Sequence, residues 1–308
     1  MGAARSASES VPPAFSLDGC WNVYLDCGSN IGVQVRKLFE PGAFANASVQ
    51  PHFKRLFGTW SERRNRACAV GFEPNPYHSE RLEAIQTRYA ELGLRATFLS
   101  RTAVGTRDGE ALFYFDTSAD GKAHEQWGAG LIPFAMNQGR RSAFHNSSSV
   151  SRHVGKRTKV RIIDLVSWIE RYVLRRQLPP SPPPARRPAL MMKMDIEGSE
   201  VEVLPRLLHT RVLCAFTTVF IEYHACFLRG TRAEVSLRWP MEFAANASRA
   251  CPETEFLRLD DETYLHDGVP GAAATQATRV TSAADIIALL VKTPERGGGS
   301  PLSAIKTN

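Results

Sequence analysis

Short apolar runs of strand length alternate along the chain with longer stretches whose apolar residues recur at helical spacing. The first run, residues 23–25, ends at Asp26, and helical spacing returns at residues 33–39. Later runs of strand length are residues 68–72, 96–99, 159–163, 190–194, 217–221 and 285–291. Strands that alternate with helices predict an α/β fold with a mostly parallel sheet and helices on both of its faces.

Three segments interrupt this alternation. Residues 41–66 show no clear period, so we expect an irregular insertion that packs on the edge of the sheet. Residues 124–155 form a second expected insertion, a long loop. Residues 179–188 are rich in proline and form a third, expected to be a surface linker between two core elements.

The two ends of the chain differ in character from the part between them. Residues 1–16 are small and polar and residues 294–308 are rich in glycine, so we expect a disordered leader and a disordered tail. One domain over residues 17–293 remains. Near its end, residues 256–259 and 263–265 flank three acidic residues, a pattern that predicts an antiparallel C-terminal hairpin.

The first connection from strand to helix carries two glycines and an acid. Residues 23–32 read Val-Tyr-Leu-Asp-Cys-Gly-Ser-Asn-Ile-Gly. In an open α/β sheet, a small ligand binds beyond the carboxyl end of the first strand, and Gly28 and Gly32 let the backbone approach it. The same pattern also occurs in proteins where the glycines serve close packing alone.

The kind of ligand follows from the acid in this turn. When Gly28 is aligned with the middle glycine of the dinucleotide pattern G-x-G-x-x-G, Asp26 and Ile31 stand where the other glycines belong. A bound pyrophosphate is therefore disfavoured, because an acid aimed into the crevice would repel it. A ligand with a positive charge fits better.

A second acid stands at the tip of the next strand of the predicted sheet. Residues 68–72 are followed by Glu73, Pro74, Asn75 and Pro76, and the prolines stop the strand. An acid at this place can accept hydrogen bonds from both hydroxyls of a ribose. Alternatively, it stabilises the start of the following helix through the helix dipole. The acid and glycine turn at residues 26–32 favours the ribose role.

A third charged stretch follows the apolar run at residues 190–194. Strand alternation places Lys193, Asp195 and Glu197 on one side, and burial of each charge without a partner would cost several kcal/mol. These side chains are therefore either paired with one another or exposed at a site. The following strand, residues 217–221, also ends in polar residues, among them His224.

Four segments in chain order, residues 24–32, 71–76, 102–105 and 193–200, resemble the FkbM-type S-adenosylmethionine-dependent methyltransferases. The resemblance implies a class I methyltransferase fold, Rossmann-like, with a seven-stranded sheet that holds S-adenosylmethionine at its carboxyl edge. It places the methionine portion among Asp26, Gly28, Asn30 and Gly32, the ribose hydroxyls at Glu73, and the adenine at Ala103 and Val104. Ser29 and Pro74 complete the cofactor-binding residues that it implies.

Methyl transfer is an in-line displacement, so the enzyme must hold a nucleophile close to the methyl carbon. A hydroxyl acceptor also loses a proton, and the candidate catalytic residues for this task are Asp195, Glu197 and His224. His224 has the most suitable ordinary pKa, although it would also suit a strand end as a hydrogen-bonded core residue. No metal is predicted, because Asp195 and Glu197 have no third ligand in sight.

The family resemblance implies O-methylation of a small molecule or a sugar hydroxyl, with a small-molecule or glycan acceptor as the partner. The three insertions are the segments that would shape the acceptor pocket, so the acceptor itself does not carry over. One alternative is a non-catalytic binding protein with the S-adenosylmethionine fold. Another, a nicotinamide-dependent oxidoreductase, ranks last, because it requires glycine in place of Asp26 and an acid much closer to Gly28 than Glu73 is.

The composition of the chain limits its binding partners and its cellular location. The 308 residues are 43% hydrophobic and carry a formal charge of +7, but the cations are spread along the chain and not interleaved with aromatic residues, so no nucleic-acid partner is expected. No signal-peptide pattern opens the chain and no run is long enough to span a membrane, so we predict a cytoplasmic protein. The start of the chain also fits the loose myristoylation pattern at Gly2. The oligomeric state is open.

The six cysteines, at positions 20, 27, 68, 214, 226 and 251, show no C-x-x-C pair and stand mostly in apolar segments. This pattern is typical of buried free thiols in a reducing compartment, and not of a disulfide framework or a zinc site.

Overall fold

The computed structural model describes residues 15–115, 126, 128–132, 156–180, 187–224 and 239–258. Its central sheet has the strand order β3-β2-β1-β7-β8-β9, and every neighbouring pair is parallel. The strands are β1 Asn22–Cys27, β2 Ala67–Glu73, β3 Arg95–Ser100, β7 Leu190–Met194, β8 Thr218–Ile221 and β9 Glu255–Arg258. The predicted α/β, Rossmann-like fold is thus confirmed. A seventh strand and the second arm of the expected hairpin lie outside the described residues.

The order in which the chain adds strands to the sheet reverses at its centre, between β1 and β7. The chain moves outward from β1 to β2 and β3, returns to β7 on the other side of β1, and continues to β8 and β9. Asp26 of β1 pairs with Gly71 of β2 on one side and with Lys193 of β7 on the other. Ligands of open α/β sheets bind at such a switch point, beyond the carboxyl ends of the strands.

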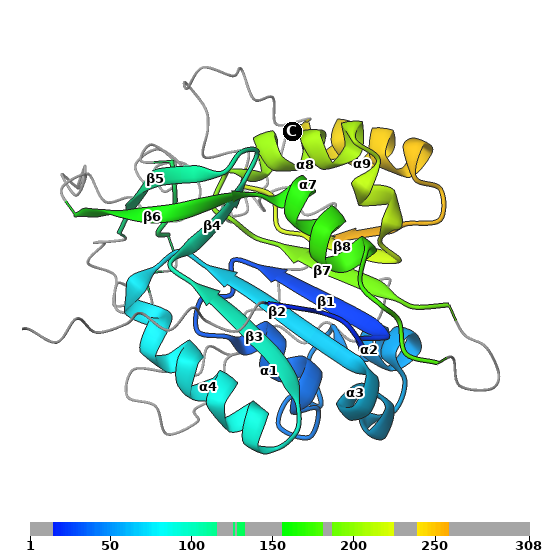
Figure 1. Ribbon diagram of the computed structural model, residues 1–308. Coiled ribbons are helices and arrows are strands. Elements are labelled where there is room, and N and C mark those ends of the chain that lie inside the picture. Colours follow the sequence, from blue (N-terminus) through cyan, green and yellow to red (C-terminus); the bar gives the residue numbers. More distant parts are fainter. Residues whose placement is uncertain are drawn as a thin grey trace, which may run out of the picture.

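Helices cover both faces of this sheet (Figure 1). One face carries α1 Val33–Phe39, α2 Gln50–Phe57, α3 Trp60–Arg66 and α4 Ser79–Glu91. The other carries α7 Leu165–Trp168, which continues as the π-helical turn η2 Ile169–Leu174, together with α8 Glu200–His209 and α9 Trp239–Ala250. The predicted arrangement of helices on both faces is confirmed.

Residues 41–66 do not form the irregular insertion at the sheet edge that the sequence predicted. They contain α2 and α3, and Phe53 and Phe57 of α2 are buried in the same apolar cluster as Tyr24 of β1. Thr59 and Glu62 make a reciprocal capping box at the start of α3. This segment therefore belongs to the layer that covers one face of the sheet.

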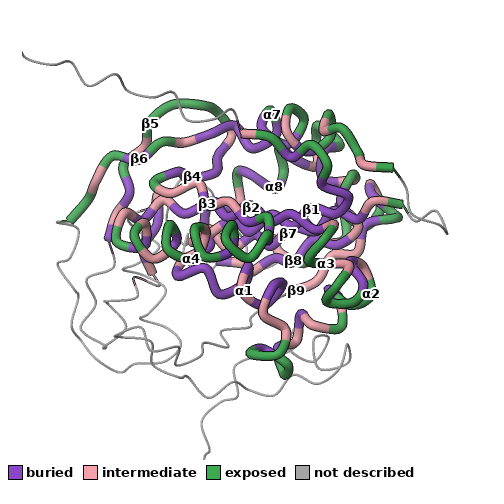
Figure 2. The backbone as a smooth tube through the Cα atoms, turned by 60° about the horizontal axis from the view of Figure 1, so that its bottom comes forward, coloured by how far each residue is buried: buried purple, intermediate pink, exposed green. Residues whose placement is uncertain are grey.

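Two large apolar clusters lie on the two faces of the central sheet. Figure 2 shows that its central strands are buried. Val23 and Leu25 of β1 face the cluster that includes α8, whereas Tyr24 faces the cluster that includes α1 and α4. Every residue of β1, β2, β7 and β8 is buried. Burial on both faces is the reason why these strands read as near-continuous apolar runs.

A small second sheet lies at the end of the main one, with the order β4-β6-β5. Its strands are β4 Thr102–Gly105, β5 Gly109–Tyr114 and β6 Arg157–Asp164. β6 pairs with β4 in parallel and with β5 in antiparallel orientation, so β4 and β5 are not direct neighbours. Of the expected insertion 124–155, only residues 126 and 128–132 are described, and there Gly130 pairs with Tyr114.

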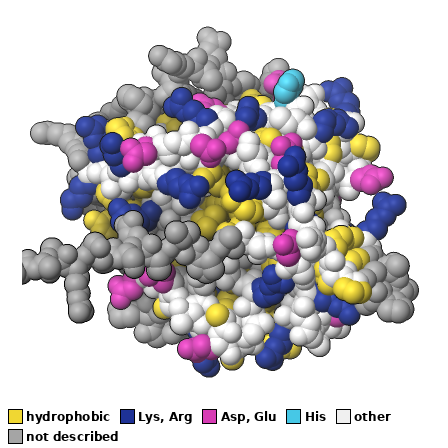
Figure 3. Space-filling model, in the orientation of Figure 1, with side chains coloured by type: hydrophobic (Ala, Val, Ile, Leu, Met, Phe, Trp, Pro, Cys, Tyr) yellow, Lys and Arg dark blue, Asp and Glu magenta, His cyan; other side chains and the backbone are white. Residues whose placement is uncertain are grey.

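Charged side chains of both signs are interspersed over the face of the molecule that Figure 3 shows. On this face the lysines and arginines do not gather into one continuous basic stripe, the arrangement that binding to a nucleic-acid backbone favours. None of the helices in the described part of the chain combines the length and the apolar character that crossing a bilayer requires.

The prediction that all cysteines are free thiols is wrong for four of them. Disulfide bonds join Cys20 to Cys68 and Cys214 to Cys251, whereas Cys27 is free and buried. Register explains the first bond: Asn22 of β1 pairs with Ala67 of β2, which brings two cysteines that are 48 residues apart in sequence to the same end of neighbouring strands. Cys226 lies outside the described residues. Disulfides are typical of oxidising compartments. The cysteines therefore no longer support the predicted cytoplasmic location.

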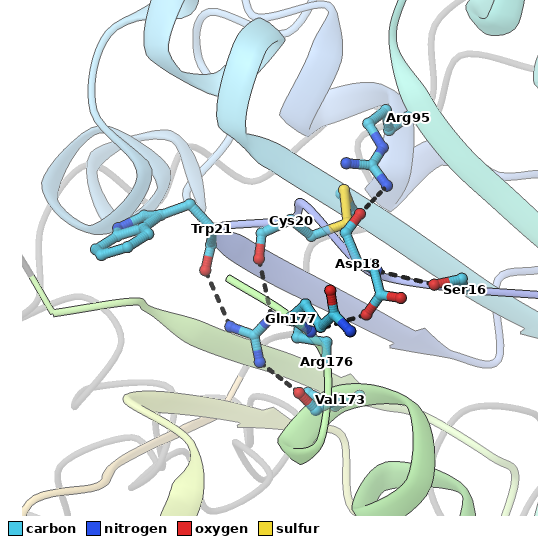
Figure 4. The surroundings of a disulfide bond; sticks show 9 residues. Ser16, Asp18, Cys20, Trp21, Arg95, Val173, Arg176 and Gln177 are labelled. Carbon is cyan, nitrogen blue, oxygen red and sulfur yellow. Dashed lines mark hydrogen bonds between the residues drawn. A yellow bond between two sulfur atoms is a disulfide. The ribbon is translucent and has the colours of Figure 1, made fainter. Parts of the chain in front are cut away.

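The first disulfide lies where several hydrogen bonds fasten the chain ahead of β1 (Figure 4). Arg176 donates to the carbonyl oxygens of Cys20 and Trp21 at 2.9 and 3.0 Å. Arg95 donates to the carbonyl of Asp18 at 2.7 Å, and the Asp18 carboxylate accepts from the Gln177 amide at 2.8 Å. The entry into the central strand is thus held by both covalent and polar contacts.

Removal of this disulfide is expected to destabilise the protein. The double variant Cys20→Ala with Cys68→Ala should lose about 2–4 kcal/mol of unfolding free energy, because the open chain regains conformational entropy when it unfolds. Chemical denaturation of the oxidised protein measures this loss. Thiol labelling in denaturant without reductant should leave Cys20, Cys68, Cys214 and Cys251 unlabelled, and labelling of all four would contradict both bonds.

Candidate active site

A pocket that is partly open to solvent lies beyond the carboxyl ends of β1, β2 and β7. The small sheet forms the opposite wall with Ala103 and Val104 of β4 and Phe113 of β5. Seven of the nine predicted cofactor residues line it, namely Gly28, Ser29, Asn30, Glu73, Pro74, Ala103 and Val104.

The glycine turn after β1 is shaped by a close approach of two chain segments. Gly28 and Gly32 both have a φ of 84°, in the left-handed region that favours glycine. A Cβ atom at Gly28 would overlap the carbonyl oxygen of Asp195, which follows the neighbouring strand. Gly28 is therefore required for the two strand ends to lie side by side at the pocket floor. Gly32 does not line the pocket, but begins α1 as its N-cap residue.

Glu73, at the end of β2, is a buried carboxylate held by two backbone donors. Its Oε2 accepts a hydrogen bond from the Asn30 amide at 2.6 Å, and its Oε1 accepts one from the Asn75 amide at 2.7 Å. Burial raises the pKa of Glu73 to about 8, although both hydrogen bonds and the charge of Lys193 act in the opposite direction. The two amides fix the orientation of the carboxylate at the pocket wall.

Asp26 does not point into the crevice as the sequence predicted. It is fully buried, does not line the pocket, and lies 4.0 Å from the Lys193 ammonium. Neither of its carboxylate oxygens has a hydrogen-bond partner among the described residues. Burial raises its pKa to about 6, against the lowering effect of Lys193.

Lys193 connects the two strand ends beneath the pocket. Its Nζ donates to Asp195 Oδ2 at 2.7 Å and to the Gly28 carbonyl at 3.0 Å. Burial alone would lower the pKa of Lys193, but the carboxylates of Asp195 and Asp26 keep it well above its usual value. In return, Lys193 holds the pKa of Asp195 below its usual value despite burial. Of the three charged residues, Lys193 and Asp195 are thus paired with each other, and all three, Glu197 included, line the pocket.

A group of carboxylates surrounds His224 at the same end of the pocket. The His224 Nε2 lies 3.5 Å from Glu222 Oε1 and 3.9 Å from both Asp195 Oδ1 and Glu197 Oε2. Burial alone would lower the pKa of His224, but Glu197 and Glu200 hold it well above its usual value. Burial raises the pKa of Glu197 and of Glu222, and neighbouring carboxylates add to the effect.

The structure brings together the three predicted catalytic residues, but in unequal positions. Asp195 and Glu197 line the pocket, whereas His224 is buried and is not part of the lining. Sequence reasoning missed Glu222, which lines the pocket two residues before His224, and Glu200, which is buried beneath it. Glu222 directly follows the predicted strand 217–221, and this position was the signal for it. Glu200 is the last residue of the segment 193–200, but nothing in the sequence pointed to its contact with His224.

The sequence model of the Methyltransferase FkbM domain matches residues 26–243, which is well over half of the chain. The chain belongs to the FkbM methyltransferase family. The matched region begins at the acid of the glycine turn and ends within α9, so it contains Glu73, the Lys193 network and the carboxylates around His224.

Comparison with solved structures finds a similar protein of the same family. The FkbM methyltransferase from Methylobacillus flagellatus matches with 14% sequence identity and a TM-score of 0.36. The match covers 78% of this chain and 39% of that one, so the chain spans well under half the length of that FkbM protein. No curated protein matches the chain.

Proposed function

We propose that the chain is an S-adenosylmethionine-dependent methyltransferase that methylates a hydroxyl oxygen of a small molecule or a sugar. The observation that carries this proposal is the Glu73 carboxylate, which two backbone amides hold at the wall of the pocket at the switch point of the sheet. A carboxylate at the end of the second strand suits the two hydroxyls of a ribose.

The charge of the pocket supports a cationic cofactor. Four carboxylates line it, those of Glu73, Asp195, Glu197 and Glu222, and Lys193 is the only cation among the described lining residues. Each of these carboxyl groups repels a pyrophosphate and attracts the sulfonium of S-adenosylmethionine when it is ionised. The absence of a side chain at Gly28 lets the turn lie directly against the backbone of Asp195. The described residues thus fit this cofactor.

S-adenosylmethionine supplies an electrophilic methyl group when it is bound. The residues of the chain have two further tasks, orientation and proton removal. Glu73 and the turn at Gly28 would hold the cofactor, with Ala103 and Val104 of β4 against its adenine. Glu197 and Glu222 line the pocket and are therefore within reach of an acceptor's hydroxyl proton, whereas the Asp195 carboxylate is engaged by Lys193.

Methyl transfer from radiolabelled S-adenosylmethionine to a panel of sugars and small hydroxyl compounds tests this function. We expect label in at least one acceptor, and loss of that label in the Glu73→Gln variant. Binding of S-adenosylmethionine without transfer to any acceptor would favour the alternative of a non-catalytic binding protein. Absence of both binding and transfer would contradict the proposal.

The pH dependence of cofactor affinity is expected to follow Glu73. Its pKa of about 8 means that the free protein carries a protonated Glu73 at pH 7, whereas two donating ribose hydroxyls require the ionised form. Binding must then release a proton, so the dissociation constant should fall by up to about tenfold per unit as the pH rises toward 8, and level off above it. Calorimetric titrations from pH 6.5 to 9 measure this. In the Glu73→Gln variant this dependence should disappear, and a profile equal to that of the native protein would assign it to another group.

A further inference from the structure

Three potential metal ligands of different types converge at one end of the pocket. Asp195 and Glu197 belong to the loop between β7 and α8, and His224 follows β8. One ligand atom from each lies within 4.8 Å of the other two. The sequence predicted no metal because the two carboxylates lacked a third ligand, and the fold brings His224 to them as that ligand.

The His224 ring is oriented as the imidazole of a metal ligand is. Its Nδ1 lies 3.1 Å from Oε1 of Glu200, a fully buried carboxylate at the start of α8. Each oxygen of Glu200 also accepts a backbone hydrogen bond at 2.8 Å, one from Ile196 and one from Gly198. Glu200 thus holds the Nδ1 side of the ring, and Nε2 faces the carboxylates of Glu222, Asp195 and Glu197. Histidines that bind metals typically donate their second N–H to a carboxylate in this way.

The charges around His224 also favour a cation at this place. Four carboxylates, those of Asp195, Glu197, Glu200 and Glu222, lie within 4.0 Å of the His224 ring nitrogens. The only lysine or arginine that forms a described ion pair with any of the four is Lys193, which contacts Asp195. The repulsion among carboxylates at such short range is relieved when a divalent ion binds between them.

We propose that Asp195, Glu197 and His224 bind one divalent transition-metal ion at the inner end of the pocket. Ligand atoms of a tetrahedral ion with bonds of about 2.0–2.2 Å lie about 3.4 Å apart, so the 3.9 Å from Nε2 to each carboxylate needs only a small contraction. One imidazole with two carboxylates suits manganese, iron or zinc better than magnesium or calcium, which prefer oxygen ligands alone.

The role of the ion rests on the proposed methyltransferase function. Because Asp195 and Glu197 line the pocket, an ion between them is open to an oxygen of the acceptor. A metal-bound hydroxyl has a lowered pKa, so its proton leaves more easily. Glu222 lines the pocket 3.5 Å from His224 Nε2 and is in position to accept that proton. The acceptor hydroxyl would then be activated by the metal and by Glu222 together.

Titration of the metal-free full chain with Mn²⁺, followed by loss of the electron paramagnetic resonance signal of the free ion, tests the site without any cofactor. We expect one ion per chain with a micromolar dissociation constant. The variants Glu197→Gln and His224→Gln should each weaken binding at least tenfold. Glu200→Gln should weaken it about 10- to 100-fold through the orientation of His224. Circular dichroism establishes that each variant is folded.

The matched control is Glu202→Gln, which removes the same charge from α8 two residues beyond Glu200 but at an exposed position. Its affinity for Mn²⁺ should equal that of the native chain. No binding of Mn²⁺ or of Zn²⁺ in a parallel titration would overturn the proposal. Binding that survives Glu197→Gln and His224→Gln would overturn it as well, because the ion would then be elsewhere.

Titrations of the same protein with Mn²⁺ and with S-adenosylmethionine distinguish a failure of the metal site from a failure of the proposed function. Binding of Mn²⁺ without binding of S-adenosylmethionine would retain the metal site and refute the cofactor. Binding of S-adenosylmethionine with label transfer that a chelator leaves unchanged, and no binding of Mn²⁺ or Zn²⁺, would retain the methyltransferase and refute the metal site.

Discussion

Replacement of Glu73 by glutamine is expected to weaken the binding of S-adenosylmethionine about 10- to 150-fold. This range corresponds to about 1.5–3 kcal/mol, the usual contribution of hydrogen bonds to a charged group. A glutamine also presents its NH₂ group to one of the two amide donors, Asn30 or Asn75, that now meet a carboxylate oxygen. Calorimetric titration with S-adenosylmethionine at pH 8.5, above the pKa of Glu73 in the native chain, measures the loss.

The control for this variant is Glu80→Gln, which removes an exposed carboxylate from the first turn of α4, close to Glu73 in sequence. Its affinity for the cofactor should stay within about twofold of the native value, since isolated surface charges contribute little. Equal affinities of Glu73→Gln and Glu80→Gln would remove Glu73 from the cofactor site.

Replacement of Lys193 by methionine is expected to lower the free energy of unfolding by about 3–5 kcal/mol. Removal of one partner from a buried ion pair leaves an uncompensated charge. Here Asp195 would lose a contact of 2.7 Å, and Asp26 its one described cation within 4.0 Å. The bond from Lys193 to the Gly28 carbonyl is lost as well, so the turn at the pocket should loosen. Urea denaturation measures the stability, and titration with S-adenosylmethionine measures the effect on the turn.

A control variant and a double variant show whether the loss of stability in Lys193→Met comes from the buried ion pairs. Lys159→Met breaks an exposed pair with Glu110 at 3.1 Å and should cost less than about 1 kcal/mol. The double variant Asp26→Asn with Lys193→Met should recover part of the loss, because one buried charge no longer lacks a partner. A cost below about 1 kcal/mol for Lys193→Met would mean that the buried network does not hold the strand ends together.

The fold was predictable because strand runs and helical spacing follow directly from burial. The strands at residues 68–72 and 190–194 appear as β2 and β7 within about one residue of their predicted ends. The helices within residues 41–66 were not predicted, although Thr59 and Glu62 form the capping box whose spacing is a helix-start signal. These helices are each eight residues or fewer, too short to show a clear period.

The site was predictable at the carboxyl ends of the strands. Glu73, Asp195 and Glu197 line the pocket because the last residues of neighbouring parallel strands, and the residues just after them, meet at one edge of the sheet. Asp26 was misplaced because its side chain is fully buried and is not part of the pocket lining. Glu200 was missed because its role depends on contact with His224, which comes from a different strand. The disulfides were missed because strand register, and not cysteine spacing, pairs Cys20 with Cys68.

The central claim is that the pocket at the switch point binds S-adenosylmethionine through Glu73. Calorimetric titration of the full chain with S-adenosylmethionine, beside a titration with NADH, tests it most directly. The account predicts micromolar binding of one S-adenosylmethionine per chain, at least tenfold weaker binding in Glu73→Gln, and no binding of NADH. No heat with S-adenosylmethionine, or binding of NADH that Glu73→Gln weakens, would contradict it.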